Sequence, residues 1–339
     1  MTAIQQTLKE LAAGRDLSAE LMRSTMQDLM AGRTDPVQVG GFLMALRVKG
    51  ETPVELAAAA QVMREVARRV EVDRDGLTDI VGTGGDGASL FNVSTASAFA
   101  AAAAGVRVAK HGGRSVSSSS GAADVLEAAG CCIDLAPEEV AVLIGELGLG
   151  FMFAPVYHVA MKHAIGPRRA LGLRTIFNLL GPLTNPAFVP NKLLGVFSAQ
   201  LVVPMAEVLR SLDIRHALVV HSGDGLDEIS PAAPTRAAEL KDGAITELTI
   251  NPAAFGIQHA NLDALRVENA ADSLALIESA LGGQPGPAAD MVALNAGAAI
   301  YVSGRADSLA SGVEKARRVL ASGAGLERLK QYAQRSHEL

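Results

Sequence analysis

Residues 79–124 read DIVGTGGDGASLFNVSTASAFAAAAAGVRVAKHGGRSVSSSSGAAD, and they carry the clearest signals of secondary structure and of a binding site in the chain. A short apolar strand at 79–81 runs into a glycine-rich loop, residues 82–87, whose backbone N–H groups can turn toward one point. Asn92 then caps an alanine-rich helix, and a helix N-terminus favours an anion. A second strand, 106–109, leads to a second loop, 110–121, which carries two cations and a run of serines. Two strand ends thus deliver two anion-binding loops, and parallel sheets bind ligands at the carboxyl ends of their strands.

The glycine loop taken alone also fits a simple tight connection between a strand and a helix. It is not a Walker loop, because no Gly-Lys-Ser/Thr follows, and it lacks the GxGxxG spacing of a dinucleotide-binding helix. The serines at 117–120 taken alone would indicate a flexible linker. Their position between Lys110, Arg114 and a predicted helix at 121–129 favours a phosphate-binding cradle instead.

Composition restricts the class of protein and its partners. The chain has 339 residues, 49% of them hydrophobic, which is enough for one large and one small domain. Its net charge of -6 argues against nucleic acid or an anionic membrane surface as a partner. Cys131 and Cys132 are adjacent, and neighbouring cysteines rarely bridge, so we expect a reducing, cytoplasmic location. The apolar run 96–104 is too short to cross a membrane, and charges at Lys9 and Glu10 argue against a signal peptide.

The first 70 residues carry only helical signals. Ser18 caps a predicted helix that runs through Met30. Asp35-Pro36 and Thr52-Pro53 start two further helices, expected to end near residues 50 and 70. We therefore expect a separate helical domain over residues 1–72, with part of 165–190 packed on it. Its apolar faces need a partner, so we expect a homodimer formed through this domain.

From residue 73 to 339 the pattern alternates between strands and helices. The predicted fold class is α/β, with a small N-terminal all-helical domain and a large α/β domain whose mainly parallel central sheet is covered by helices. A turn signal at 241–243 predicts an antiparallel hairpin. The predicted strands are 78–81, 106–109, 149–153, 193–198, 216–221, 236–240 and 245–250, and the predicted helices are 93–104, 121–129, 137–147, 157–171, 199–212, 288–303 and a segment beyond 308.

Two further charged segments are candidates for a site. Arg168 can hold a carboxylate with its planar guanidinium, although a solvated basic helix end is the common alternative. Asp227 and Glu228 follow an apolar strand at 217–220, and such surface carboxylates are usually only solvated. At a strand end near two phosphate-type loops they become candidate ligands for magnesium, which prefers carboxylates, phosphates and water. Their sequence neighbours supply no cysteine or histidine, which also favours an oxygen-liganded ion.

Taken together, these segments resemble the anthranilate phosphoribosyltransferase family along nearly the whole chain. The resemblance implies Mg²⁺-dependent transfer of the phosphoribosyl group of phosphoribosyl pyrophosphate to the amine of anthranilate, with release of pyrophosphate, in tryptophan biosynthesis. It also implies a helical domain plus an α/β domain, usually as a dimer. The matching segments are GTGGDG at 82–87, NVST at 92–95, KHGGRSVSS at 110–118, ADVLEAAG at 123–130, the run from FMFAP through GPRR to TIFNLLGPLTNPA at 151–187, and DGLDEIS at 224–230.

Carried over by position, the resemblance implies three groups of binding residues and no certain catalytic residue. The phosphoribosyl donor is expected to contact Gly82, Gly85, Asp86, Leu90, Asn92, Val93, Ser94, Thr95, Lys110, His111, Gly112, Gly113, Arg114, Ser115, Val116, Ser117, Ser118 and Ala122. Anthranilate is expected to contact Gly82, His111, Gly113, Arg168 and Pro182. The expected magnesium ligands are Ser94, Asp227 and Glu228.

Three positions depart from the family pattern. Gly113 stands where the family usually has an asparagine that contacts anthranilate, and Leu90 and Ala122 stand where hydroxyl residues are common. Each change removes one polar contact, worth roughly 0.5–1.5 kcal/mol. A pyrimidine-nucleoside phosphorylase is one alternative, but it has no obvious use for Asp227 and Glu228. A non-catalytic, nucleic-acid-binding relative is the other, and it would require a basic face that this acidic chain lacks.

Overall fold

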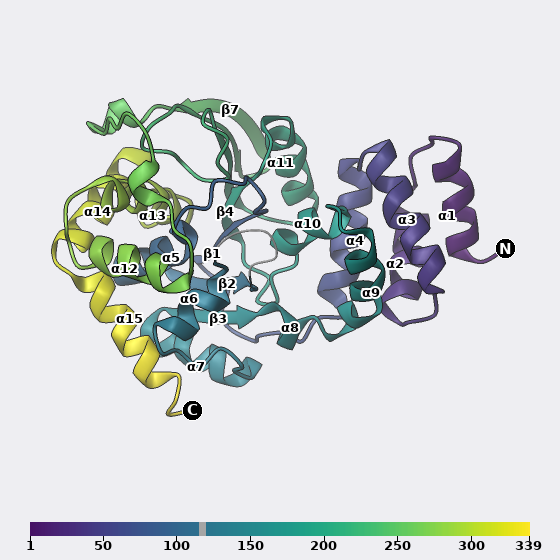
Figure 1. Cartoon of the computed structure of the whole chain (residues 1–339), viewed down its shortest axis with the longest axis horizontal. Helices are drawn as coiled ribbons and strands as arrows, with labels where there is room; N and C mark the ends of the chain where they lie inside the picture. The colour runs from purple at the N-terminus through teal and green to yellow at the C-terminus, as the bar shows by residue number, and fades with distance from the viewer. Residues whose placement is uncertain (115–119) are drawn as a thin grey trace.

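The computed structural model describes residues 1–114 and 120–339. The N-terminal part is a bundle of four helices, which stands apart from the sheet in Figure 1. Local signals start each helix: Thr2, Ser18, Asp35 and Thr52 are N-caps whose side chains accept a hydrogen bond from the first turn. The helices are α1 (Ala3–Ala12), α2 (Ala19–Met30), α3 (Pro36–Lys49) and α4 (Pro53–Glu65).

The predicted end of the last bundle helix was wrong, because α4 ends at Glu65 and not near residue 70. Beyond it the backbone bonds to distant segments of the chain. The N–H of Arg68 donates to the carbonyl of Tyr157, and the N–H of Val70 donates to the carbonyl of Pro186. These tertiary bonds replace the helical ones and fasten the connection to the α/β part.

The central sheet has seven strands in the order β3-β2-β1-β4-β5-β6-β7. The first five are parallel, and β6 and β7 add an antiparallel edge, as predicted from the hairpin signal. Asp242 and Gly243 both have positive φ, as a tight hairpin turn requires. The strands are β1 (Leu77–Gly82), β2 (Arg107–Gly112), β3 (Leu149–Phe153), β4 (Asn191–Gly195), β5 (His216–Ser222), β6 (Thr235–Lys241) and β7 (Ala244–Ile250).

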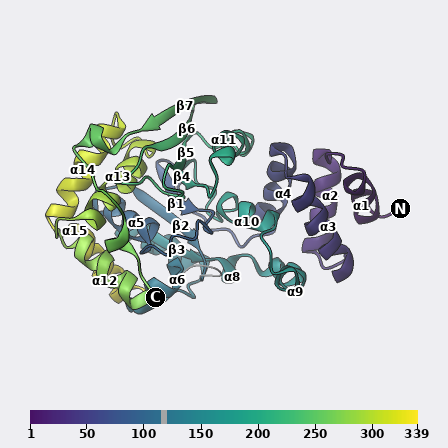
Figure 2. The same cartoon turned by 45° about the horizontal axis from the view of Figure 1, so that its top comes forward.

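Two apolar cores flank the sheet. The larger one packs the alanine-rich helix α5 (Val93–Ala103) and its neighbours against the strands, on the far side from the helical bundle in Figures 1 and 2. The other core is continuous from the sheet through α11 (Val202–Ser211) into α2, α3 and α4. The remaining helices of the first core are α6 (Ala122–Ala128), α7 (Pro137–Leu147), α12 (Ala270–Leu281), α13 (Pro287–Val302), α14 (Leu309–Ala321) and α15 (Ala324–Arg335).

Residues 154–183 connect the two parts of the molecule. The single helix predicted at 157–171 is interrupted at His158, whose φ of -113° and ψ of 57° are not helical. The segment instead forms α8 (Ala154–Tyr157), η1 (Val159–Met161), α9 (Lys162–Leu171), α10 (Ile176–Leu180) and η2 (Gly181–Leu183). Helix α9 packs on α2 and α3, and α10 packs on α3 and α4. Other single turns are η3 (Ala199–Leu201), η4 (Pro252–Phe255) and η5 (Asp263–Leu265).

Among residues 1–114 and 120–339, no helix combines the length and apolar character needed to cross a bilayer.

Candidate active site

The glycine loop after β1 turns tightly against the loop after β5. Gly84, Gly85 and Gly87 have φ between 65° and 77°, a region that favours glycine. The N–H of Gly84 donates to Oδ2 of Asp227 at 2.7 Å. A Cβ at Gly82 would collide with the same oxygen, so this approach requires glycine. The loop therefore lies directly against the acidic pair that sequence reasoning identified.

The N-terminus of α5 forms the floor next to this loop. Oδ1 of Asn92 accepts a hydrogen bond from the N–H of Thr95 at 3.0 Å and another from the hydroxyl of Ser94 at 3.2 Å. Nζ of Lys110, on β2, donates to Oγ of Ser94 at 3.0 Å and to the carbonyl of Ile80 at 2.8 Å. Burial lowers the pKa of Lys110 to about 8, although nearby carboxylates favour its charged form. A buried cation thus lies beneath the helix N-terminus.

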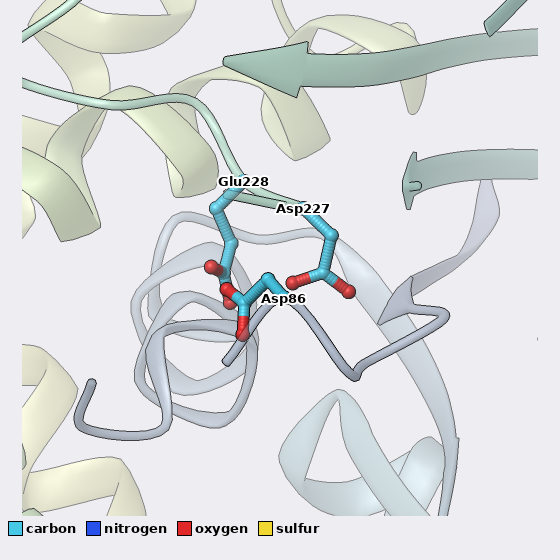
Figure 3. Close-up of side chains that lie close together, drawn as sticks. All are labelled: Asp86, Asp227 and Glu228. Atoms are coloured by element: carbon cyan, nitrogen blue, oxygen red, sulfur yellow. The ribbon is translucent and has the colours of Figure 1, made fainter. Parts of the chain in front are cut away.

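Three carboxylates converge beside the loop. Oxygen atoms of Asp86, Asp227 and Glu228 all lie within 4.8 Å of one another, and Figure 3 shows the three groups pointing together. Burial and Asp86 raise the pKa of Asp227 to about 6. Burial, Asp227 and Asp86 raise the pKa of Glu228 well above its usual value, and Lys110 offsets only part of this repulsion. Because the remaining repulsion calls for a further positive charge, the all-oxygen cluster fits a hard divalent ion such as Mg²⁺.

Arg168 adds a cation to the lining of the same cleft. It extends from α9, and its guanidinium lies 5.3 Å from the centre of the Phe177 ring. No carboxylate in the described part of the chain forms an ion pair with it. An unpaired, half-buried guanidinium is well suited to a planar carboxylate on a ligand.

His111, which lines the same cleft as Arg168, forms a pair of neutral histidines with His158. The rings of His111 and His158 have centroids 5.0 Å apart in an edge-on arrangement. Burial, followed by the neighbouring His158, lowers the pKa of His111 to about 3. Burial likewise lowers the pKa of His158 to about 4. Nε2 of each ring is buried without a partner in the described structure, and of the two rings only His111 lines the cleft.

One cleft of about 410 Å³ brings most of the predicted site residues together. Val93 and Thr95 are exceptions, because both are buried inside α5 and do not line the cleft. Residues 115–118, also predicted to bind the donor, lie outside the described residues. The predicted residues that line the cleft are Gly82, Gly85, Asp86, Leu90, Asn92, Ser94, Lys110, His111, Gly112, Gly113, Arg114, Ala122, Arg168, Pro182, Asp227 and Glu228.

Sequence reasoning missed two features of this cleft. It assigned Asp86 to the donor and not to the acidic cluster, although the glycines around Asp86 indicate a tight approach. It also missed Arg174, whose guanidinium donates to the carbonyl of Gly85 and lies 4.4 Å from the centre of the Phe197 ring. No local pattern distinguishes Arg174 from its basic neighbours, because its partner is far away in the sequence.

Comparisons with known proteins agree with this geometry. Residues 5–67 match the helical bundle domain of a glycosyl transferase family, and residues 74–326 match its a/b domain. The chain is 59% identical over 334 residues to the anthranilate phosphoribosyltransferase of Cellvibrio japonicus, which covers 97% of both chains. It is 59% identical over 319 residues to that of Chromohalobacter salexigens, covering 94% of this chain and 93% of the relative.

Solved structures show the same similarity. The anthranilate phosphoribosyltransferase of Thermus thermophilus superposes with a TM-score of 0.92 at 46% identity, covering 98% of this chain and 99% of that one. The enzyme of Saccharomyces cerevisiae in complex with PRPP and Mg superposes with a TM-score of 0.90 at 27% identity, covering 99% and 98%.

Proposed function

The chain belongs to the anthranilate phosphoribosyltransferase family, and from this premise we propose how its cleft performs that family's reaction. The phosphoribosyl group of phosphoribosyl pyrophosphate passes to the amine of anthranilate in tryptophan biosynthesis. The bond from ribose C1 to the pyrophosphate oxygen breaks, and a bond from C1 to the anthranilate nitrogen forms. The observation that carries the proposal is the single cleft in which an anion-binding loop, three converging carboxylates and an unpaired arginine face one another.

The donor side holds the phosphates. Backbone N–H groups of the glycine loop and the N-terminus of α5 offer donors to phosphate oxygens, and Lys110 adds a buried positive charge close by. Asp227 and Glu228, with Asp86 beside them, would hold Mg²⁺, and the hydroxyl of Ser94 lies in the same cleft. The chemistry that bound Mg²⁺ supplies is neutralisation of negative charge on the departing pyrophosphate.

The acceptor side orients anthranilate. Arg168 pairs with its carboxylate, while His111 and Pro182 pack against the ring. Proximity supplies much of the rate, because the amine is held in line with ribose C1. With a pKa of about 3, His111 is too weak a base to remove a proton from the amine beforehand. No prior deprotonation is needed, since the amine is already neutral and becomes acidic once the new C–N bond forms, and its proton then passes to water or to the departing pyrophosphate.

We also propose that the boundary between the helical domain and the α/β domain lies after residue 72. The protein works as a homodimer in the cytoplasm. An exposed apolar stripe on α3, formed by Val37, Met44 and Val48, supports the dimer. Val37 and Val48 are 82% and 76% exposed, and a second copy of the same stripe would cover them. Sedimentation of Val48→Glu should give a monomer, whereas the matched control Val142→Glu on α7 should remain a dimer. A monomeric unmodified protein at micromolar concentration would refute the dimer.

One assay tests the function. Purified protein is mixed with anthranilate, phosphoribosyl pyrophosphate and Mg²⁺, and the fluorescence of anthranilate is followed. We expect the fluorescence to fall as one pyrophosphate appears for each anthranilate lost, and we expect EDTA to stop the reaction. Unchanged fluorescence at saturating substrates, or phosphate-dependent cleavage of a pyrimidine nucleoside instead, would overturn the proposal.

A further inference from the structure

A buried ion pair lies beneath the acceptor side of the cleft. Asp79 on β1 and Lys192 on β4 are direct partners in the register of the two parallel strands. Nζ of Lys192 donates to Oδ2 of Asp79 at 2.9 Å, and the side chains of Asp79 and Lys192 are 0% and 2% exposed. Neither residue lines the cleft, so neither can touch a substrate.

Each member of the pair also bonds to a wall of the cleft. Nζ of Lys192 donates a second hydrogen bond to the carbonyl of Pro182, in the single turn that follows α10. Oδ1 of Asp79 accepts a hydrogen bond from the backbone N–H of His111 at 3.4 Å. His111 and Pro182 are the two residues that we place against the anthranilate ring. Two walls from distant parts of the chain are therefore joined through one pair of charges.

The alternation of side chains along a strand separates this support from the donor side. Lys110 and His111 are consecutive on β2, so their side chains point to opposite faces of the sheet. Lys110 bonds to Ser94 on the α5 face, whereas the main chain of His111 bonds to Asp79. A change at Asp79 or Lys192 should therefore disturb the acceptor walls more than the phosphate-binding floor.

Stability alone does not account for the pair. Two buried charges cost more to desolvate than they return unless further hydrogen bonds satisfy them, and well-packed apolar residues often stabilise a core equally well. Burial by itself would raise the pKa of Asp79, but Lys192, Asn185 and Lys110 outweigh it and lower that pKa. Burial lowers the pKa of Lys192 as well, although its bond to Asp79 favours the charged form, and each member of the pair directs one hydrogen bond outward to a fixed point on the cleft wall.

We propose that Asp79 and Lys192 are positioning residues for the aromatic acceptor, setting the spacing between His111 and Pro182 across which the acceptor ring fits. The inference rests on the proposed function, because it assigns these walls to anthranilate. It adds to that function a pair of residues that touch neither substrate and that affect the binding of anthranilate only.

The test is a comparison of both Michaelis constants in Lys192→Met. Methionine fills the same volume but loses the bond to Pro182 and leaves Asp79 uncompensated. We expect KM for anthranilate to rise by about tenfold or more, while KM for phosphoribosyl pyrophosphate changes by less than about threefold. The matched control is Lys49→Met, which removes a similarly buried ion pair with Glu55 in the helical bundle, where neither residue lines the cleft. It should lower Tm without moving either KM.

A second variant guards against misfolding. In Asp79→Asn combined with Lys192→Met, neither member of the pair is left as an uncompensated charge, and Lys110 keeps the carboxylate of Glu228 nearby, so the protein should fold even where the single variant does not. The acceptor KM should still rise, because the carbonyl of Pro182 has lost its donor. An unchanged anthranilate KM in either folded variant, or an equal rise in both constants, would overturn the inference. Loss of transferase activity in the unmodified protein would instead overturn the proposed function.

Discussion

The donor and acceptor sides of the cleft are built in different ways. The phosphate-binding part of the donor side consists of strand ends and a helix N-terminus that lie close together in the sequence, from Gly82 to Lys110. Only the metal ligands Asp227 and Glu228 reach it from a distant segment, the loop after β5. The acceptor side gathers Arg168, His111 and Pro182 from three separate segments, and two of these segments pack on the helical bundle. The phosphate-binding part of the donor side is thus a local sequence motif, whereas the acceptor side is brought together from distant segments of the chain.

This difference implies that the two sides can fail separately. Substitutions on the donor side should abolish chemistry, because charge on the leaving group is handled there. Substitutions on the acceptor side should mainly weaken binding of one substrate, because that side orients anthranilate and takes no part in breaking the bond to pyrophosphate. Variants on each side can therefore test whether the division holds.

The largest effect is expected from Asp227→Asn combined with Glu228→Gln. Turnover should fall by about a thousandfold or more, because the leaving pyrophosphate loses its metal. The matched control is Glu247→Gln, an exposed carboxylate on β7 paired with Arg236, which should leave turnover unchanged. Near-normal turnover of the double variant at low Mg²⁺ would contradict the assignment of the ligands.

The same double variant should be more stable than the unmodified protein when metal is absent. The folded state raises the pKa of both carboxyls, so their stabilising contribution is present at low pH and is lost as pH rises through the folded values. At about pH 8 in EDTA, neutralising them should therefore raise Tm by about 2–4 °C. A lower Tm in the double variant would mean that the carboxylates serve the fold and not the metal.

The next largest effect is expected from Arg168→Ala. The KM for anthranilate should rise by roughly 10–100-fold through loss of a charge-assisted hydrogen bond, and the donor KM should stay within about threefold. Arg169→Ala is the matched control, because Arg169 is adjacent, exposed and absent from the cleft lining. A rise in KM for phosphoribosyl pyrophosphate alone would mean that Arg168 belongs to the donor side.

Lowering the pH should weaken Mg²⁺ binding on the donor side and leave the binding of anthranilate unchanged. Protons compete with the metal for Asp227, whose pKa is about 6 without metal, so Mg²⁺ affinity should weaken below that pH by about tenfold per unit for each proton displaced. Activity titrated with Mg²⁺ at about pH 8, 7, 6 and 5.5 measures this dependence, because these values span the transition. If Mg²⁺ affinity does not change with pH, the metal binds elsewhere. If KM for anthranilate shifts over the same pH range, the donor and acceptor sides are not independent.

The smallest effect is expected from Gly113→Asn, which restores the side chain usual in the family. A Cβ at Gly113 meets no atom of residues 1–114 or 120–339 within 4 Å and φ is not positive, so asparagine fits there without backbone strain. The KM for anthranilate should fall by about 2–10-fold through one added hydrogen bond. Gly85→Ala is the contrasting variant, since φ is 77° and Arg174 lies 2.7 Å from the added carbon, so it should damage donor binding. An unchanged anthranilate KM in Gly113→Asn would remove this position from the acceptor side.

Much of the fold could be predicted from the sequence because its signals are local. The caps at Ser18, Asp35 and Thr52 and the turn at Asp242-Gly243 specify elements through their immediate neighbours. The family resemblance and the mainly parallel sheet were confirmed. Two helix predictions were wrong: one helix was predicted to continue past Glu65, and another was predicted to continue through His158. Both errors occur where backbone groups bond to distant segments.

The residues of the candidate site show the same contrast between local signals and distant contacts. The glycine loop, the cap at Asn92 and Lys110 could be identified from one stretch, because a single strand–loop–helix–strand unit, β1 to β2, carries them. The bond from Arg174 to Gly85 and the pair of Asp79 and Lys192 could not, since 89 and 113 residues separate the partners. A charged residue within an apolar strand, as at Asp79 in β1 and Lys192 in β4, is a signal that could have indicated a buried pair.

A calorimetric titration of phosphoribosyl pyrophosphate with Mg²⁺ into three proteins measures the separation of the two sides directly. We expect the unmodified protein and Arg168→Ala to bind the donor with the same Kd, within about threefold. We expect Asp227→Asn with Glu228→Gln to lose this metal-dependent binding. If Arg168→Ala loses donor binding as fully as the acidic variant does, the two sides are a single unit and the division described here is wrong.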